Sequence, residues 1–370
     1  MSTDDIVRVP VETIKAFMVD VFEGLGVPRA EAEVCRDVLI TSDLRGIDSH
    51  GVGRLKMYYD RIRAGIQNPE TDFEIVRETP ATAVVDGHDG MGHVIGVRSM
   101  RMAIDKAREY GLGAVAVRNS THYGIAGYYP LMAIEADMIG FSTTNARPSV
   151  PPTFGVEPML GTNPIAFGCP TDEDCPFVID CATSISQRGK IEVLGRAEKD
   201  TPEGWAVNQD GTVATDTERL LKDLVAGTAA LLPLGGLGEL MGGHKGYGIS
   251  VAFEVLSAAL QNGSYLKGLH GFDEAGNRVP YKLGHFFLAI DIAHFVPVAD
   301  FKRTAGEIVR RLRQSKKAPG QDRIWTAGEK EWEMEKRRPE EGVPVNANLQ
   351  KNLLTMRDEL GLTQHVFPFE

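Results

Sequence analysis

Two side chains near the start of the chain have types and spacing suited to proton transfer and anion binding. In the segment Asp48-Ser49-His50-Gly51-Val52-Gly53-Arg54, an imidazole precedes a guanidinium by about one helical turn. A histidine exchanges a proton near neutral pH, and an arginine binds a carboxylate through two parallel hydrogen bonds. This pairing suits a site for a small acidic substrate. The alternative is that Asp48 or Ser49 caps a helix from about Gly51 to Ala64, with His50 and Arg54 as solvated residues of its first turn.

A second histidine stands where α/β proteins place reactive groups. The stretch Asn119-Ser120-Thr121-His122-Tyr123-Gly124 follows a predicted strand and precedes a helix expected from Tyr128 to Ala136. His122 is therefore a second candidate proton carrier. The alternative is a structural role, in which the ring forms a hydrogen bond with a loop carbonyl.

Three further turns place polar or glycine residues beside apolar segments: Gly161–Pro164, Asp180–Ser184 and Gly242–Gly248. The last of them opens a predicted helix, so its backbone amides and Lys245 can hold a pyrophosphate through hydrogen bonds and helix-terminal charge. A flexible connector ahead of a helix explains the same glycines.

The segment Gly90-Met91-Gly92-His93-Val94-Ile95-Gly96 is a loose version of a dinucleotide-binding loop. A doubly wound dinucleotide fold carries an acid at the end of its second strand, whereas this chain has Arg118 there, which suits a 2′-phosphate. Glycines that let a helix approach a neighbour are the favoured explanation.

A metal-dependent hydrolase using His88, Asp89 and His93 is a distant alternative. Such a site needs three or four converging ligands, and adjacent side chains on a turn point apart. No metal site is therefore expected.

The charge balance excludes several classes of partner. The 370 residues carry 40 basic and 51 acidic side chains, a net charge of −11, so the chain repels nucleic-acid phosphates and anionic membranes. The four cysteines include no Cys-x-x-Cys pair, which argues against a metal knuckle. Without a basic-then-apolar leader or a clean run of about 20 apolar residues, a cytoplasmic location with no membrane partner is expected.

Helical periodicity marks both ends of the chain. It runs to about Gly65 and returns in the tail at Glu329–Arg338 and Asn348–Glu359. We expect the tail to pack on the helical opening. Two more helices are predicted at Gly246–Gln261 and Ala299–Ser315.

Strand signals fill the middle of the chain. Strand Ala83–Val85, helix Gly96–Tyr110 and strand Leu112–Val117 predict one β-α-β unit. From Gly140 to about Val213, short β-rich runs such as Phe141–Asn145 alternate with proline and glycine. The fold class is therefore α/β, in the α+β sense, with helical ends and a separate sheet.

Taken together, six motifs resemble those of the non-Rossmann malate/L-lactate dehydrogenase family, which includes ureidoglycolate, sulfolactate and diketogulonate oxidoreductases. The resemblance runs from about residue 5 to 360 with the motifs in the expected order. They are Arg45–Arg54, Asn119–Gly124, Leu160–Phe167, Asp180–Ser184, Pro202–Ala206 and His244–Gly248.

The resemblance implies a nicotinamide-dependent oxidoreductase of 2-hydroxy and 2-keto acids, which uses NAD or NADP and forms a homodimer. It also implies a largely antiparallel cofactor-binding sheet. The domain organisation expected on this basis is a helical domain 1–75 completed by C-terminal helices at about 325–370, a β-α-β segment 76–120 and a cofactor-binding domain 121–324.

By the same resemblance, His50 and His122 are candidate proton donors and acceptors, with Ser49 beside them and Arg54 as the carboxylate anchor. Which histidine has the main role stays open. The positions that match cofactor contacts are Asp180, Cys181, Ala182, His244, Lys245, Ala146, Gly328, Glu329 and Lys330, with Thr162 and Asn163 expected on the nicotinamide side.

Three departures from the family pattern bear on these expectations. An acid in place of Arg147 would suit the ribose diol of NAD, whereas Arg147 tolerates a phosphate, so the choice between NAD and NADP stays open. Cys181 stands where methionine is frequent, a change expected to be neutral. Residues 220–237 form an insertion of unclear use before Lys245.

Malate/oxaloacetate is the expected substrate pair. Ureidoglycolate, sulfolactate, lactate and cyclic imino acids are the alternatives within the family. A catalytically silent binding protein is disfavoured because His50, Arg54, His122 and Lys245 are all present.

Overall fold

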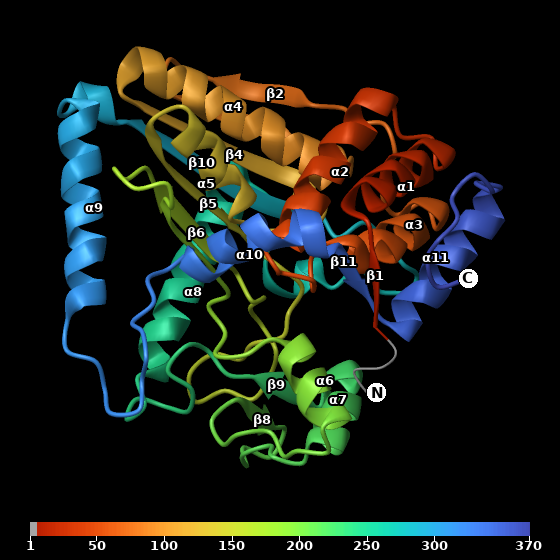
Figure 1. Cartoon of the computed structure of the whole chain (residues 1–370). Helices are drawn as coiled ribbons and strands as arrows, with labels where there is room; N and C mark the ends of the chain where they lie inside the picture. Colours follow the sequence, from red (N-terminus) through yellow and green to blue (C-terminus); the bar gives the residue numbers. More distant parts are fainter. Residues whose placement is uncertain (1–5) are drawn as a thin grey trace.

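The computed structural model describes residues 6–370, in which a central mixed sheet is flanked by helices (Figure 1). Seven strands lie in the order β2-β3-β4-β10-β5-β6-β7. Their bounds are β2 Glu74–Glu78, β3 Thr82–Asp86, β4 Leu112–Ser120, β5 Met138–Thr144, β6 Ile165–Cys169, β7 Phe177–Cys181 and β10 Leu283–Asp291.

Only one pair of neighbours in this sheet, β3 and β4, is parallel, and the other pairs are antiparallel. The predicted β-α-β unit and the predicted largely antiparallel sheet are thus both confirmed. The crossover of the β-α-β unit is α4 (Gly92–Tyr110). At two positions in the first turns of this helix there is no space for a side chain. A Cβ on Gly92 would lie 2.3 Å from the Thr121 carbonyl oxygen, and one on Gly96 2.6 Å from the Tyr129 ring. These glycines serve close packing.

Helices cover both faces of the sheet. On β10, the neighbouring residues Phe286 and Phe287 point to opposite faces. Phe287 meets Tyr129 of α5 (Tyr128–Glu135), which also contacts α4. Phe286 meets Phe141, whose ring in turn contacts Phe253 of α8 (Gly243–Ala258). The strands that carry the site are therefore buried on both sides.

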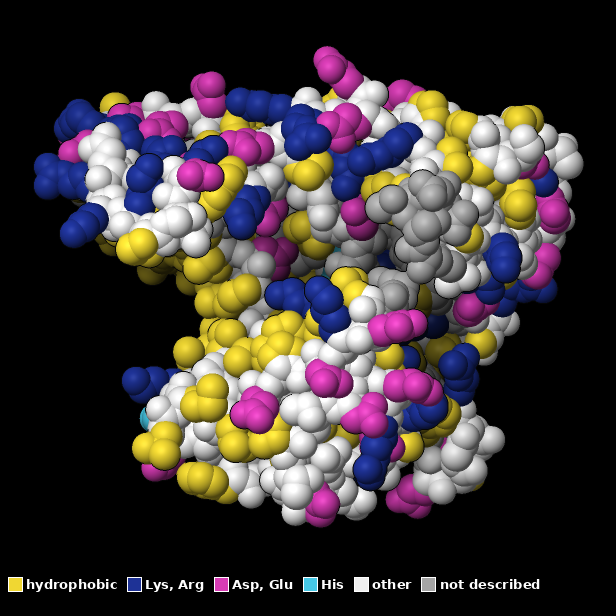
Figure 2. All heavy atoms as spheres, turned by 60° about the horizontal axis from the view of Figure 1, so that its bottom comes forward, with side chains coloured by type: hydrophobic (Ala, Val, Ile, Leu, Met, Phe, Trp, Pro, Cys, Tyr) yellow, Lys and Arg dark blue, Asp and Glu magenta, His cyan; other side chains and the backbone are white. Residues whose placement is uncertain are grey.

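A smaller lobe lies below the sheet in Figure 1 and contains β8 and β9 with α6 and α7. Their bounds are α6 Arg188–Arg196, β8 Ala206–Asn208, α7 Thr217–Ala226 and β9 Ala229–Leu231. The insertion at 220–237 supplies part of α7 and all of β9, so it is an integral part of this lobe. Hydrophobic side chains gather on the face seen in Figure 2, between the upper and lower parts of the molecule.

The predicted helices of the second half are present. Besides α8, the chain forms α9 (Val298–Gln314), α10 (Glu329–Glu341) and α11 (Ala347–Leu360). Short 3-10 turns occupy Ala259–Gln261, Leu266–Leu269 and Ile292–His294. Within residues 6–370, none of the helices combines the length and apolar character needed to cross a bilayer.

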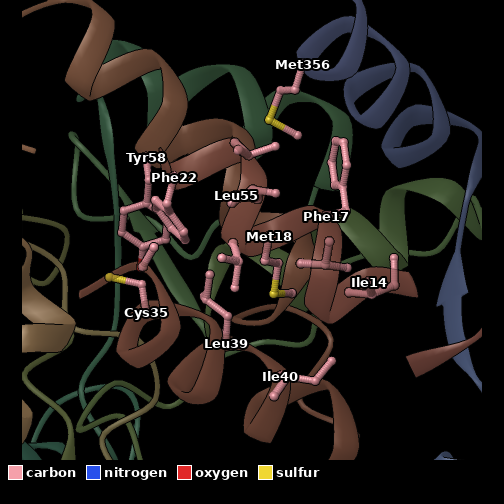
Figure 3. Close-up of a cluster of buried hydrophobic side chains, with 14 of the residues drawn as sticks. Ile14, Phe17, Met18, Phe22, Cys35, Leu39, Ile40, Leu55, Tyr58 and Met356 are labelled. Atoms are coloured by element: carbon pink, nitrogen blue, oxygen red, sulfur yellow. The ribbon is translucent and has the colours of Figure 1, made fainter. Parts of the chain in front are cut away.

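The two ends of the chain pack together, as expected. Helices α1 (Val11–Gly24), α2 (Arg29–Leu44) and α3 (Leu55–Arg63) share a buried core with Leu353 and Met356 of α11 (Figure 3). The opening is not entirely helical, because β1 (Val7–Val9) pairs with β11 (Val343–Val345). Tyr58 of α3 lies beside Phe22 in this core, with ring centroids 6.2 Å apart. The helical part therefore fixes one side chain that reaches the site.

Candidate active site

The loop before α3, the segment after β4 and the ends of β5 and β7 enclose a cavity of about 280 Å³. Among the residues expected to be functional, Ser49, His50, Ala146, Thr162, Asp180, Cys181 and Ala182 line it together with His122. These residues come from widely separated parts of the sequence. Their convergence on one cavity is the main structural support for the site.

His122 follows directly on β4 and is held from behind by α3. The Tyr58 hydroxyl lies 2.6 Å from its Nδ1, and the backbone N–H of Gly124 donates to the same nitrogen at 3.3 Å. Because a backbone amide can only donate, Nδ1 acts as an acceptor and Nε2 carries the hydrogen of the neutral ring. Burial, followed by the charges of His50, Arg61 and Arg54, holds the pKa of His122 well below its ordinary value.

His50 faces His122 across the cavity, with ring centroids 5.8 Å apart and the planes inclined by 24°. Its Nδ1 lies 2.8 Å from the Ser49 hydroxyl, which fixes the orientation of the ring. Burial and the neighbouring Arg54 lower the pKa of His50 to about 4. His50 is therefore neutral at physiological pH, and it can donate or accept a hydrogen bond.

Arg54 closes the loop that carries His50. It ends the 3-10 turn Val52–Arg54, and its Nε donates to the Ser49 carbonyl at 2.7 Å. Within residues 6–370, no carboxylate lies in ion-pair distance of Arg54, so the remaining N–H groups of its guanidinium are available to an anion. Arg54 is not among the residues that line the cavity, and its role as a carboxylate anchor stays a prediction.

A buried carboxyl group supports the same loop. Asp43, near the end of α2, accepts a hydrogen bond from the backbone N–H of Val52 at 2.8 Å and is 1% exposed. A Cβ on Gly51 would lie 1.9 Å from its Oδ1. Burial raises the pKa of Asp43 well above its usual range. From α10, Arg338 pairs with Asp48 at 3.0 Å and so fastens the start of the loop.

Two further histidines lie under the site. His285 of β10 bridges Ser120 of β4 and Thr144 of β5 through its two ring nitrogens, at 2.8 and 2.7 Å, and stacks on Tyr123 at 4.4 Å. His93 of α4 is fully buried against Tyr58 at 4.7 Å, and neither of its ring nitrogens has a hydrogen-bond partner among residues 6–370. Burial lowers the pKa of each to about 3, so both are neutral structural groups.

A second cavity, of about 350 Å³, adjoins the first and shares with it Ile47, Ile125, Asp180, Cys181 and Glu331. Beyond this shared wall it is lined by Trp325, Gly328 and Lys330. The two volumes together are in the range of cofactor sites. An aromatic face, a lysine and a glycine turn next to a cavity that holds two histidines are groups that fit a nucleotide cofactor.

Asp180 stands between the two cavities. Its Oδ2 accepts a hydrogen bond from the Gly127 backbone N–H at 2.7 Å. Although it is exposed to the cavity space, the surrounding walls raise the pKa of Asp180 to about 6 by desolvation. Asp180 can thus offer either an acceptor or a hydroxyl donor near neutral pH.

Besides Arg54, four of the expected residues have side chains outside the lining of either cavity. Asn163 is buried behind the wall, where its amide donates to Glu254 at 2.8 Å and to the Ser250 carbonyl. Glu329 accepts from the Thr326 N–H at 2.8 Å and pairs with Arg313 at 2.7 Å, so it stabilises the turn that leads into α10. His244 and Lys245 lie exposed in the first turn of α8, outside the lining of either cavity.

The loose glycine loop and the hydrolase hypothesis receive no structural support. Arg118 pairs with Asp86 at 2.7 Å, so it is not free to bind a 2′-phosphate. His88 contacts Glu74 at the surface, whereas His93 points into the core. In the part of the chain that the structure describes, no three His, Cys, Asp or Glu side chains are grouped to hold a metal ion.

Sequence reasoning missed several residues of the site. Tyr58 lies four residues after Arg54 on the same helical face, so spacing could have indicated it. Glu331 and Trp325 gave no such signal, because their place depends on how the tail folds back over β7.

Comparisons with known proteins agree with this architecture. The family model described as malate/L-lactate dehydrogenase matches residues 9–354. The chain is 45% identical to malate dehydrogenase of Pyrococcus horikoshii, covering 97% of each protein, and 38% identical to L-sulfolactate dehydrogenase of Methanocaldococcus jannaschii, covering 95% of this chain and 96% of that protein. The crystal structure of malate dehydrogenase from Entamoeba histolytica superimposes with a TM-score of 0.92 at 44% identity, covering 96% of this chain and 98% of that one.

Proposed function

Because this chain belongs to the malate/L-lactate dehydrogenase family, we propose that it interconverts malate and oxaloacetate with NAD or NADP as the hydride carrier. The observation that carries the proposal is the cavity in which two neutral histidines face each other. The charge of Arg54, which has no acidic partner within residues 6–370, acts on both of them. The similarity to malate dehydrogenases over nearly the whole chain favours malate within this family. L-Sulfolactate, which carries a sulfonate in place of one carboxylate, is the second candidate.

His122 is proposed as the proton carrier. Its Nε2 points away from the groups that hold Nδ1, so this atom is proposed to face the substrate. The protonated ring donates its Nε2 proton to the keto oxygen, which leaves a neutral ring with its hydrogen on Nδ1. In the reverse direction this tautomer, with a bare Nε2, accepts the proton of the hydroxyl group. The Tyr58 hydroxyl donates to a bare Nδ1 and accepts from a protonated one, so it stabilises both states of the ring. Tyr58 is thus a positioning residue.

His50 and Arg54 are proposed to orient the substrate. A neutral His50 forms a hydrogen bond with the reacting oxygen or the neighbouring carboxylate, and Arg54 pairs with that carboxylate. Ser49 fixes the His50 ring through the hydrogen bond at Nδ1. These contacts align the reacting carbon without a change in the charge of His50.

The nicotinamide cofactor supplies or accepts the hydride when it is bound. The residues proposed to hold it are those of the shared wall and the second cavity, with Asp180, Gly328 and Lys330 as its polar contacts and Trp325 as its aromatic surface. Thr162, Ala146, Cys181 and Ala182 complete the wall on the side of His122. Glu329 and Asn163 are proposed to support this wall from behind.

Two finer assignments concern the choice of cofactor and the assembly of the chain. Arg147 is exposed, follows Ala146 in the wall and has no ion pair within residues 6–370, so we propose that a 2′-phosphate is tolerated and both NAD and NADP are used. A homodimer is proposed because exposed apolar side chains cluster along one stretch of the chain. They are Leu234, Leu237, Leu240, Met241, Ile249, Val255 and Leu260.

A substrate panel tests the proposed function. Purified protein is given NADH or NADPH with oxaloacetate, pyruvate, sulfopyruvate or a cyclic imine, and oxidation of the cofactor is followed by its absorbance. We expect oxaloacetate to give the highest kcat/KM. Turnover of only the cyclic imine, or no turnover by protein that binds neither reduced cofactor, would exclude the proposed activity.

A further inference from the structure

Arg61 is a cation beside the site that has no role in the proposed function. Arg61 lies on α3 three residues after Tyr58 and seven after Arg54. These spacings put all three side chains on one face of the helix. Since the Tyr58 hydroxyl on this face contacts His122, the two arginines flank the contact point between α3 and the candidate site.

Arg61 is half-buried and lacks a counterion. Its guanidinium carbon lies 4.4 Å from the ring centroid of Tyr281, two residues before Leu283, which lines the cavity. Among residues 6–370, no Asp or Glu lies within ion-pair distance of Arg61. On the same helix, Arg63 does pair with an acid, Glu359. Holding a cation in such a place without a partner is costly, and the cost is recovered when an anion binds.

The charge pattern of the cavity is also uneven. The two acidic side chains in its lining, Asp180 and Glu331, both belong to the wall shared with the second cavity. The charges of Arg61 and Arg54 act on His122 and help to lower its pKa, whereas Arg147 acts on Arg61. Arg54 and Arg61 lie behind the lining of the cavity, but their charges reach it from the α3 side and exceed what one carboxylate neutralises.

We propose that Arg61 forms a second anion subsite, which binds the carboxylate or sulfonate at the far end of a dianionic substrate. This inference rests on the proposed function, in which Arg54 binds the carboxylate next to the reacting carbon. A monocarboxylate such as pyruvate occupies Arg54 and leaves Arg61 unpaired. Arg61 is thus the residue that selects oxaloacetate and similar dianions over pyruvate.

Binding of two unreactive acids of equal carbon length tests the subsite without requiring turnover. Succinate and butyrate are titrated against protein saturated with NADH or NADPH, and affinity is taken from the shift in Tm. The wild type should bind succinate about 10- to 100-fold more tightly than butyrate, since a charge-assisted hydrogen bond contributes on this scale. Arg61→Gln should lose this advantage with butyrate unchanged. Arg61→Lys should retain part of it.

Arg63→Gln, on the same helix, is the matched control and should behave as the wild type. If Arg61→Gln does not fold, Arg61→Met takes its place. The subsite is excluded if the wild type shows no preference for succinate or if Arg61→Gln keeps the preference. It is also excluded if Arg61→Gln lowers the affinity for both acids equally.

The same proteins are assayed with oxaloacetate and pyruvate. Oxaloacetate reduction combined with an unchanged preference in Arg61→Gln would refute the subsite and leave the dehydrogenase function standing. If Arg61→Gln abolishes the preference for succinate but the wild type reduces no keto acid, the proposed function is refuted and the subsite is supported.

Discussion

At the scale of single residues, the site depends on histidines that stay neutral. Burial and nearby arginines lower the pKa values of His50 and His122, so neither is charged in the free enzyme near pH 7. A neutral ring with a bare Nε2 accepts a proton from a hydroxy acid, whereas reduction of a keto acid needs the protonated ring. The structure therefore favours different pH dependences for the two directions.

The pH dependence follows from the lowered pKa of His122. For reduction, kcat/KM should fall about tenfold per pH unit throughout the neutral range, because the protonated fraction falls at that rate above the pKa. For oxidation, kcat/KM should stay level as the pH is lowered to 6.5, the ordinary histidine value, and below it. Both profiles are measured at constant ionic strength. A reduction profile that is flat up to pH 8 would contradict this assignment.

Sequence predicted part of this residue-scale picture. The spacing of His50, Arg54 and His122 indicated proton transfer and carboxylate binding before any contact was known. Tyr58 and Arg61 were missed because their roles depend on a contact between α3 and the segment after β4. Asn163 was expected on the nicotinamide side, but its side-chain amide donates a hydrogen bond to the buried Glu254 and so lies behind the wall.

At the scale of elements, the loop from 47 to 54 is held by its neighbours as well as by its own turns. Asp43 lies directly behind Gly51 and bonds the backbone at Val52, and Arg338 fastens the start of the loop at Asp48. His50 sits between these two attachments. The sequence indicated the loop, but neither attachment shows in a local pattern.

Gly51→Ala tests this support. The new Cβ would overlap Asp43, which is fully buried and hydrogen-bonded, so we expect a loss of about 1–3 kcal/mol in unfolding free energy. Turnover should fall at least tenfold, because the loop that carries His50 must move. Gly189→Ala is the control, since a Cβ there meets nothing within 4 Å. Chemical denaturation and steady-state kinetics give the two readouts. A variant as stable and active as the control would show that the loop adapts freely.

At the scale of the whole molecule, residues near both ends of the chain build the wall that holds Tyr58. The long helices, the β-α-β unit and the packing of the tail on the opening were all predictable from periodicity. The position of β10 was not, because this strand enters between β4 and β5 from residues 283–291. The strands β1 and β11 were missed because three residues each give no measurable period.

Leu353→Ala tests whether the tail stabilises the helical domain. Leu353 of α11 is fully buried in the core shared with α1 and α3, so its truncation should lower the unfolding free energy by about 2–5 kcal/mol. Thr355→Ala, at an exposed position of the same helix, should change it by less than about 0.5 kcal/mol. Equal effects of the two substitutions would mean that the tail contributes little to the core.

The central claim is that His122 moves the proton in a nicotinamide-dependent reduction of oxaloacetate. The most direct measurement is single-turnover oxidation of the bound reduced cofactor by oxaloacetate in wild type and His122→Gln. We predict a fall of about 10²- to 10⁴-fold in the rate, with cofactor affinity unchanged. A His122→Gln protein that oxidises the cofactor at the wild-type rate would contradict the account.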